Sequence, residues 1–227
     1  MRAKIVSVTN QKGGCGKTNL AVNFAGTAIR HGYKTVVVDA DPQGTALQWV
    51  GNAEEGAAVQ IPVIGLSHAG AKITHEIKKY IDDYDLIIVD CPPAVESPVP
   101  QAMLLISDLA LVPVVPNPGD LWAATALLEL AERMMGVNET LRVALVASIV
   151  RPNLGMTKSA LQTMATMKDN MPLFKAQINQ RAAYPESMLS GDSVHALGSA
   201  AKAAIKEIEA LYAEAMKQLH LKVEKKS

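Results

Sequence analysis

The feature that most constrains this chain is the loop at residues 10–18, which reads Asn-Gln-Lys-Gly-Gly-Cys-Gly-Lys-Thr and directly follows a short apolar segment. A strand that runs into glycines and then Gly-Lys-Thr is typical of a polyphosphate cradle. The glycines let backbone N–H groups converge on phosphate oxygens, the lysine neutralises charge, and the threonine hydroxyl can hold Mg²⁺. The helix expected from about Thr18 directs its positive end at the same anion. A glycine-rich turn with chance lysines would not explain this strand–loop–helix context.

The loop departs from the ordinary phosphate-binding pattern at its start. That pattern has glycine five residues before Gly16, whereas this chain has Gln11 there and a second lysine, Lys12, just after it. Lys12 and Lys17 are therefore both candidate catalytic residues that neutralise charge on the phosphates. The residues expected to contact the nucleotide are Lys12, Gly13, Gly14, Cys15, Gly16, Lys17, Thr18 and Asn19.

Apolar segments of strand length alternate with helical patterns along the chain. These segments read as continuous Val, Ile and Leu, which is typical of strands buried on both faces of a parallel sheet. We therefore expect an α/β fold of the P-loop NTPase type, with a doubly wound, mostly parallel sheet and helices on both faces. The expected strands are residues 4–8, 35–38, 59–66, 86–89, 109–115, 143–150 and 173–178, and the clearest helices are residues 18–31, 121–135 and 196–219.

Length and composition favour a single domain. The chain has 227 residues, of which 49% are hydrophobic and 19% are charged, as in globular proteins. No linker or repeat interrupts the pattern, so we expect one domain over residues 1–222 and a disordered tail over residues 223–227. The two cysteines, Cys15 and Cys91, have no metal-ligand spacing, which favours the reducing cytoplasm. The sequence also shows no signal peptide and no long apolar run, so we expect no membrane segment.

Two carboxylates follow the second expected strand, in the segment Asp-Ala-Asp-Pro-Gln-Gly that begins at Asp39. Asp39 and Asp41 point to the same side, because strand side chains repeat with a period of two. They emerge at the carboxyl ends of the strands, where open α/β sheets bind ligands. Such a pair can hold magnesium through water and orient an attacking water, so we expect Asp39 to serve the metal and Asp41 to be catalytic. A turn or helix N-cap role is the alternative.

A third carboxylate ends the fourth expected strand, where Leu-Ile-Ile-Val runs into Asp90. Four apolar residues followed by an acid form the Walker B arrangement, in which the carboxylate projects toward magnesium held by the loop hydroxyl. Many core strands end in an acid, so this motif alone is weak evidence for a magnesium site. It becomes strong evidence because it follows the phosphate loop and the Asp39–Asp41 pair along the chain. The expected magnesium ligands are Thr18, Asp39 and Asp90.

Charge is distributed unevenly, although the formal net charge is zero. Residues 1–141 carry 10 Lys/Arg against 15 Asp/Glu, whereas residues 142–227 carry 12 against 7. A basic face in the second half can meet a polyanion; a solvated surface with chance asymmetry is the alternative. Aromatic residues make up only 4% of the chain, which argues against stacking platforms for single-stranded nucleic acid.

Together these motifs resemble the ParA/MinD family of deviant Walker A ATPases, in its small ParA-like branch. The resemblance covers nearly the whole chain, and its blocks are residues 12–18, 39–44, 85–93, 111–116 followed by 120–122, and 178–181. It implies an ATPase that uses ATP and Mg²⁺ and forms a face-to-face homodimer around two nucleotides. In such a dimer Lys12 would reach across to the phosphates of the partner subunit.

The resemblance also implies a cellular role. In this family the ATP-bound dimer binds DNA without sequence preference, and so associates with the nucleoid. An adaptor protein then stimulates hydrolysis, and a cargo is partitioned or positioned. The cargo stays open at this point: a plasmid, a chromosome region or a protein assembly such as a microcompartment.

Several positions depart from the family pattern or carry no assigned role. Asn19 stands where the family usually has Thr, so an amide would contact the α-phosphate. Ser148 stands where many relatives have Asn, which leaves the adenine contact open. Cys15 is small enough to be a structural residue of the loop, and Trp49 and Trp122 are expected to be packing residues.

Basic residues of the second half are the expected DNA contacts, with solvated surface charge as the alternative. Arg181 is the strongest candidate, because it ends a strand and matches the family segment near the DNA-facing edge. The full set is Arg151, Lys158, Arg181, Lys202 and Lys206.

Two other functions are the alternatives to a DNA-bound partitioning ATPase. A MinD-like positioning ATPase would tether to a membrane through a C-terminal amphipathic helix, but the tail here has no aromatic anchor and few apolar residues. We therefore expect no membrane partner. A dethiobiotin-synthetase-like enzyme, which acts on a small molecule with ATP, is the alternative from a different functional class.

Overall fold

The structure is a computed structural model that describes residues 2–54, 59–93 and 97–225. Within these residues, seven strands form one sheet in which all neighbouring strands are parallel, in the order β3-β2-β4-β1-β5-β6-β7. The predicted α/β fold of the P-loop NTPase type is confirmed, and the sheet is wholly parallel. The strands are β1 (Lys4–Val8), β2 (Thr35–Asp39), β3 (Val63–Gly65), β4 (Leu86–Asp90), β5 (Leu109–Val114), β6 (Arg142–Val150) and β7 (Leu173–Asn179).

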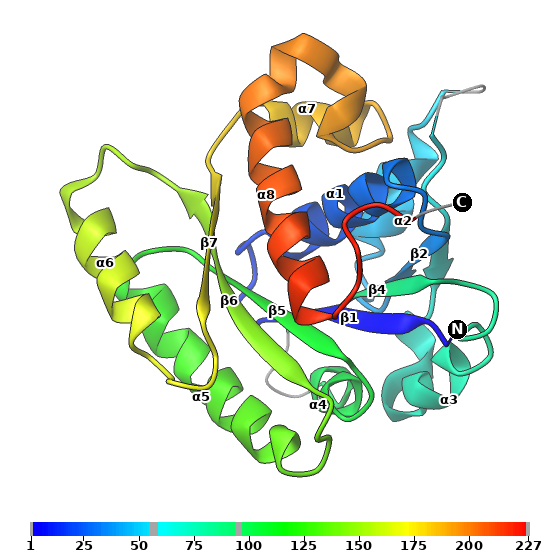
Figure 1. The fold of residues 1–227 in the computed structure, drawn as a ribbon, viewed down its shortest axis with the longest axis horizontal. Coiled ribbons are helices and arrows are strands. Elements are labelled where there is room, and N and C mark those ends of the chain that lie inside the picture. The colour runs from blue at the N-terminus through cyan, green and yellow to red at the C-terminus, as the bar shows by residue number, and fades with distance from the viewer. Residues whose placement is uncertain (1, 55–58, 94–96, 226–227) are drawn as a thin grey trace.

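Helices cover both faces of the sheet, as predicted (Figure 1). On one face α1 and α8 pack together, with the rings of Phe24 and Tyr212 edge to face at 5.3 Å between centroids. On the other face α3, α4, α5 and α6 cover the strands with aliphatic side chains. The α-helices are α1 (Lys17–Arg30), α2 (Thr45–Gly51), α3 (Ile73–Ile77), α4 (Val99–Leu104), α5 (Pro118–Met135), α6 (Gly155–Ala165), α7 (Ala183–Leu189) and α8 (Lys202–Gln218). No helix within the described residues is long and apolar enough to cross a bilayer.

The centre of the sheet brings the sequence motifs to one edge. β1 lies at the centre of the sheet, between β4 and β5. Strands β2, β3 and β4 lie on one side of it, and β5, β6 and β7 lie on the other. Such a switch point is where open α/β sheets bind ligands, beyond the carboxyl ends of the strands. The register places Val8 and Asp39 each beside Asp90. The loop after β1 therefore meets the acids that end β2 and β4.

Three element boundaries differ from the sequence-based expectation. The third strand is confined to Val63–Gly65. α5 begins at Pro118, because the side chain of Asn117 caps it by accepting the N–H of Asp120. The expected helix 196–219 is interrupted at Gly198, whose φ of 57° is not helical, so a 3₁₀ helix (Val194–Ala201) precedes α8.

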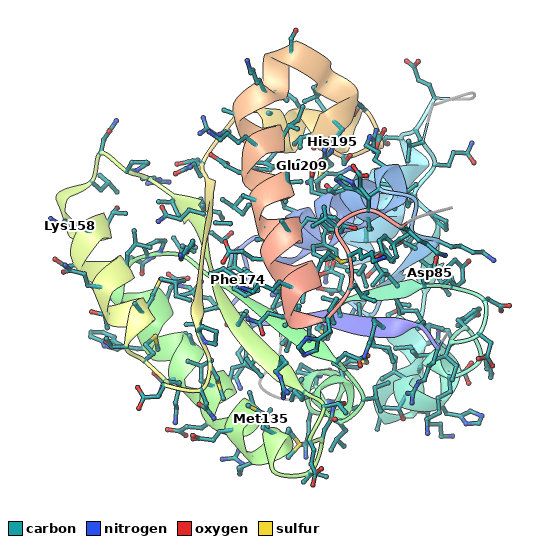
Figure 2. All side chains as sticks on the ribbon, in the orientation of Figure 1. Asp85, Met135, Lys158, Phe174, His195 and Glu209 are labelled. Carbon is teal, nitrogen blue, oxygen red and sulfur yellow. The ribbon has the colours of Figure 1, made fainter. Side chains whose placement is uncertain are left out.

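The C-terminal tail is held against the body of the protein as far as Lys225, where the sequence predicts disorder. The Tyr212 hydroxyl donates to the carbonyl of Val223 at 2.9 Å, and the N–H of Lys225 donates to the carbonyl of His31 at 3.0 Å. The Lys225 ammonium also pairs with Asp85 at 2.6 Å; Figure 2 labels Asp85. These contacts satisfy backbone groups that a disordered tail would leave to water. Residues 226 and 227 lie outside the described residues.

Candidate nucleotide and magnesium site

The phosphate loop needs glycine at two positions for its path. Gly14 and Gly16 have φ of 74° and 87°, in the left-handed region that favours glycine. A Cβ on Gly16 would also lie 2.8 Å from the Ser148 hydroxyl, so a larger residue would require the Ser148 side chain to move. Gly16 is the N-cap of α1, and no side chain in the described part of the chain caps that helix. The first N–H groups of α1 are therefore free to bind an anion.

The two lysines of the loop occupy different environments. The Lys17 side chain is buried, and its Nζ donates to the carbonyl of Lys12 at 3.0 Å, across the cradle. The Lys12 side chain points out of the cradle with 42% of its surface exposed, and its Nζ lies 2.6 Å from Oδ2 of Asp120. Lys17 is thus positioned for a phosphate inside the loop, whereas Lys12 is free to act outside it once it leaves Asp120.

Thr18 and Asp90 meet below the loop. The Thr18 hydroxyl donates to Oδ2 of Asp90 at 2.6 Å. Asp90 is only 1% exposed, and its Oδ1 has no hydrogen-bond partner within the described residues. Burial, together with the charges of Asp39 and Asp41, raises the pKa of Asp90 to about 7 against the opposing effect of Thr18. A buried acid with one unpartnered oxygen beside a hydroxyl fits a magnesium ligand pair.

The described residues hold no cluster of three or more His, Cys, Asp or Glu side chains arranged for a metal ion. This agrees with the way proteins bind Mg²⁺ beside a polyphosphate: one or two protein ligands, with phosphate oxygens and waters completing the shell.

Asp39 has a different arrangement from Asp90. Its Oδ1 accepts the N–H of Asp41 at 3.1 Å, and its Oδ2 accepts the N–H of Leu47 at 3.0 Å in the first turn of α2. Burial is the main cause of its raised pKa. Both oxygens thus accept backbone N–H groups, as expected of a carboxylate that stabilises a turn and caps a helix. These two hydrogen bonds hold the turn that carries Asp41.

Asp41 lies on that turn, half-buried at the carboxyl edge of the sheet. Its Oδ1 accepts the N–H of Gln43 at 2.9 Å, which fixes the side chain in a local turn. The position is compatible with orienting a water beside the loop.

The remaining loop residues have mainly structural contacts. Cys15 is fully buried, its Sγ lies 3.3 Å from the carbonyl of Lys12, and burial raises the pKa of the thiol. The amide of Asn23 donates to the backbone and side-chain oxygens of Asn19. Asn19 therefore presents its side chain on the first turn of α1 in a fixed orientation.

A hollow of about 450 Å³ adjoins the loop between β6, β7 and α7. Its lining includes Gly16, Asn19, Ile149, Asn179 and Tyr184, but not Ser148. The sequence left this part of the site open. The Ser148 side chain is 2% exposed, and it fills the space behind Gly16 instead of facing the hollow.

The five expected DNA contacts do not form one basic patch in the structure, and two of them are paired with other side chains. Arg181 pairs with Glu207 of α8, and Arg151 donates to Gln180. Lys202 and Lys206 are exposed at the start of α8. Lys158 is exposed on α6, across β7 from α8, where Figure 2 shows it pointing away from the molecule. The exposed lysines thus lie on two helices that cover opposite faces of the sheet.

Asp120 contacts the loop from the first turn of α5, and sequence reasoning assigned it no site role. Asp120 could be recognised only through its contact with Lys12, which lies 108 residues earlier. Trp49 is buried, as expected, and its indole N–H donates to the carbonyl of Asp192 at 3.0 Å. Trp122, which was also expected to be a packing residue, is 77% exposed.

Comparisons with known proteins agree with this geometry. A family model described as the CobQ/CobB/MinD/ParA nucleotide binding domain matches residues 6–194. The chain is 32% identical over 213 residues to the maintenance of carboxysome distribution protein A of Halothiobacillus neapolitanus, covering 94% of this chain and 96% of that protein. Its fold resembles apo McdA of Cyanothece, with a TM-score of 0.76 at 18% identity over 94% of this chain and 99% of that one. It also resembles the septum site-determining protein MinD complexed with Mg-ADP from Pyrococcus horikoshii, with a TM-score of 0.68 at 20% identity over 95% and 98% of the two chains.

Proposed function

This chain belongs to the CobQ/CobB/MinD/ParA family of nucleotide-binding domains, and from that premise we propose that it is a magnesium-dependent, ParA-like ATPase that dimerises around ATP. The observation that carries the proposal is the contact between Thr18 and Asp90 below the phosphate loop, with one buried oxygen of Asp90 left unpartnered. A hydroxyl and an acid in this position are what magnesium bound to ATP requires.

Each group of the site then has a role in binding or hydrolysis. Lys17 exchanges the carbonyl of Lys12 for a phosphate oxygen, and the free N–H groups of α1 bind the same anion. Thr18 and Asp90 hold Mg²⁺, which neutralises charge on the phosphates. Asp41 orients the attacking water. Catalysis of phosphoryl transfer consists mainly of such positioning and charge stabilisation.

Lys12 acts across the dimer interface in this proposal. Its exposed side chain and its contact with Asp120 support that role, because the ammonium of Lys17 already serves the phosphate inside its own loop. Hydrolysis would then require dimerisation, so the γ-phosphate controls association.

We extend the proposal to non-specific DNA binding by the ATP dimer, which would place the protein on the nucleoid. Lys158, Lys202 and Lys206 are the exposed charges available to phosphates, and a two-fold dimer displays each of them twice. Arg151 and Arg181 remain candidates only if they exchange their present partners, Gln180 and Glu207, for phosphates.

The proposed cargo is a protein assembly of the carboxysome type, delivered through an adaptor protein that stimulates hydrolysis. A relative with a role in carboxysome distribution matches this chain over almost its full length, and this favours a protein assembly over a plasmid or a chromosome region. A MinD-like membrane tether has less support. The apolar side chains of α8, such as Ile208, Leu211 and Tyr212, are buried in the core.

Light scattering and gel shift on the purified protein test the proposal together. With ATP and magnesium we expect a dimer that retards duplex DNA of any sequence, and with ADP a monomer that does not. Steady hydrolysis without dimerisation or DNA binding would instead favour a small-molecule enzyme of the dethiobiotin-synthetase type.

A further inference from the structure

We infer that Asn179 selects adenine by accepting a hydrogen bond from the exocyclic amino group of the base, and that Glu207 is the positioning residue that holds the Asn179 amide for this contact. The inference rests on the proposed ATP site. It adds the residue that reads the base, which neither the sequence motifs nor the phosphate loop identifies.

Asn179 lies where a base attached to the bound phosphates would reach. It is the last residue of β7 and lines the hollow of about 450 Å³ that begins at Gly16 of the phosphate loop. The apolar side chains of Ile149 and Pro185 line the same hollow and can contact the faces of a purine. A largely apolar hollow with one polar group is typical of a cofactor base pocket.

Glu207 determines which atom of the Asn179 amide is left without a hydrogen-bond partner. Asn179 donates its Nδ2 to Oε1 of Glu207 at 2.6 Å and its backbone N–H to Oε2 at 3.1 Å. Since a carboxylate only accepts hydrogen bonds, the amide nitrogen must face Glu207. Oδ1 is therefore the atom turned away from Glu207, and the orientation of the amide follows from chemistry.

Oδ1 of Asn179 is buried and has no hydrogen-bond partner within the described residues. An unpartnered buried acceptor is costly in a folded protein, and a ligand that brings a donor removes that cost. The N6 amino group of adenine is such a donor. Guanine presents the acceptor O6 at the same position and would leave Asn179 unsatisfied.

The surrounding contacts keep Glu207 in place. Arg181 donates to Oε1 through its Nε, and the Tyr184 hydroxyl donates to Oε2 at 3.0 Å. Burial and the Glu207 charge raise the pKa of Tyr184, so its hydroxyl stays a donor. Every group bound to Glu207 thus donates to it. Arg181 is held in this cluster, which explains why it is not a free surface charge.

β6 carries a distortion at the same point. The register between β6 and β7 shifts between Ser148 and Val150, and Ile149 at the shift has φ of 52°. A β-branched residue in the left-handed region is strained, and such strain is typical of functional sites. At this shift the Ile149 side chain lines the hollow, and the next residue, Val150, pairs with Asn179.

The test is calorimetric binding of three diphosphates, because diphosphates are not hydrolysed by an ATPase: ADP, GDP and purine riboside 5′-diphosphate, which lacks the amino group. The wild-type protein should prefer ADP to purine riboside diphosphate by roughly 10- to 100-fold, the effect of one buried hydrogen bond. In Asn179→Ala the two ligands should bind equally. Glu207→Gln should also reduce the preference, because a glutamine can donate and no longer fixes the Asn179 amide.

Gln177→Ala is the matched control: it changes a polar residue of the same strand that lines a different hollow, and it should keep the preference. If Asn179→Ala does not fold, the wild-type comparison of ADP with purine riboside diphosphate decides alone. Equal binding of these two by the wild type, or an unchanged preference in folded Asn179→Ala, overturns the inference. Failure of the wild type to bind any of the three diphosphates would instead contradict the proposed nucleotide site.

Discussion

Nζ of Lys12 lies 2.6 Å from Oδ2 of Asp120, and this ion pair joins the phosphate loop to the first turn of α5. The Asp120 side chain is only 6% exposed, and its backbone N–H is fixed by Asn117. Lys12 is thus held within its own subunit in the absence of nucleotide. In the proposed mechanism it must exchange Asp120 for the phosphates of a partner subunit, so the pair opposes dimerisation until ATP is present.

The first prediction follows from this exchange. Asp120→Asn weakens the hold on Lys12, so dimerisation should need less ATP, by roughly two- to fivefold for a partly exposed ion pair. Light scattering across an ATP titration measures the midpoint. Glu132→Gln is the matched control, because Glu132 also lies on α5, and breaking its ion pair with Lys168 should leave the midpoint unchanged. An Asp120→Asn protein that needs more ATP than wild type would show that Asp120 assists Lys12 in the dimer.

The two loop lysines should differ in their effect on ATP binding. Lys17→Ala removes the charge inside the cradle and should abolish binding, a loss of roughly 100-fold or more for a buried contact to a charged group. Lys12→Ala should still bind ATP, because Lys17 and the backbone of the loop are unchanged, but should lose dimerisation or hydrolysis. Calorimetry with ATP on both variants measures this. Equal loss of affinity would remove the separate role of Lys12.

Asp90→Asn should have opposite effects with and without magnesium. The folded-state pKa of Asp90, about 7, lies above its ordinary value of 3.8. The native state therefore holds this proton more tightly than the unfolded chain, and this contribution to stability is lost as the pH rises toward 7. At pH 8 the metal-free variant should melt above wild type by a few degrees, since about 1 kcal/mol shifts Tm by 2–4 °C in a chain of this size.

Melting curves at two pH values check this account of Asp90. The difference between variant and wild type should close toward pH 5, where the wild-type carboxyl is protonated. The variant should also lose the stabilisation that magnesium and ADP give to wild type. Lower stability of the metal-free variant at pH 8 would mean that the Asp90 charge is satisfied in the native protein.

A charge reversal at the start of α8 tests the DNA surface. The double variant Lys202→Glu and Lys206→Glu should bind duplex DNA more weakly and with a shallower dependence of log K on log salt, because fewer counterions are released. Lys217→Glu, exposed at the other end of α8, is the control. Arg181→Glu is a poorer probe, since it places a second carboxylate beside Glu207. Unchanged DNA binding and salt slope in the double variant would exclude this surface.

Local sequence patterns predicted the strands, the phosphate loop and the acids Asp39, Asp41 and Asp90, because each depends on residues adjacent in the chain. The expectation of a parallel sheet placed these acids at one edge, because parallel strands end on the same side. That Asp39 lies beside Asp90 is a finding of the structure. Helix boundaries were less accurate, since the break at Gly198 depends on one backbone conformation that glycine permits but does not require.

The sequence did not reveal contacts between distant residues. Lys12 and Asp120 are 108 residues apart, and Asn179 and Glu207 are 28 apart, so no local pattern pairs them. Asp39 shows the converse: its spacing suggested a metal ligand, while the structure occupies both of its oxygens with backbone N–H groups. The exposure of Trp122 also depends on tertiary packing, since its position on α5 does not show which neighbours cover it.

The central claim, that Lys12 acts on the nucleotide of the partner subunit, is tested most directly by mixing two inactive variants. Asp41→Ala should bind ATP and accumulate as a dimer while hydrolysis falls by about 10²–10⁴, the usual effect of losing a group that assists proton transfer or positions water. Lys12→Ala should be inactive as well. A mixed dimer has one site with Asp41 from one subunit and Lys12 from the other, so random pairing in an equal mixture should restore about a quarter of the wild-type ATPase rate. A mixture that stays as inactive as its two components, although light scattering shows mixed dimers, would contradict the claim.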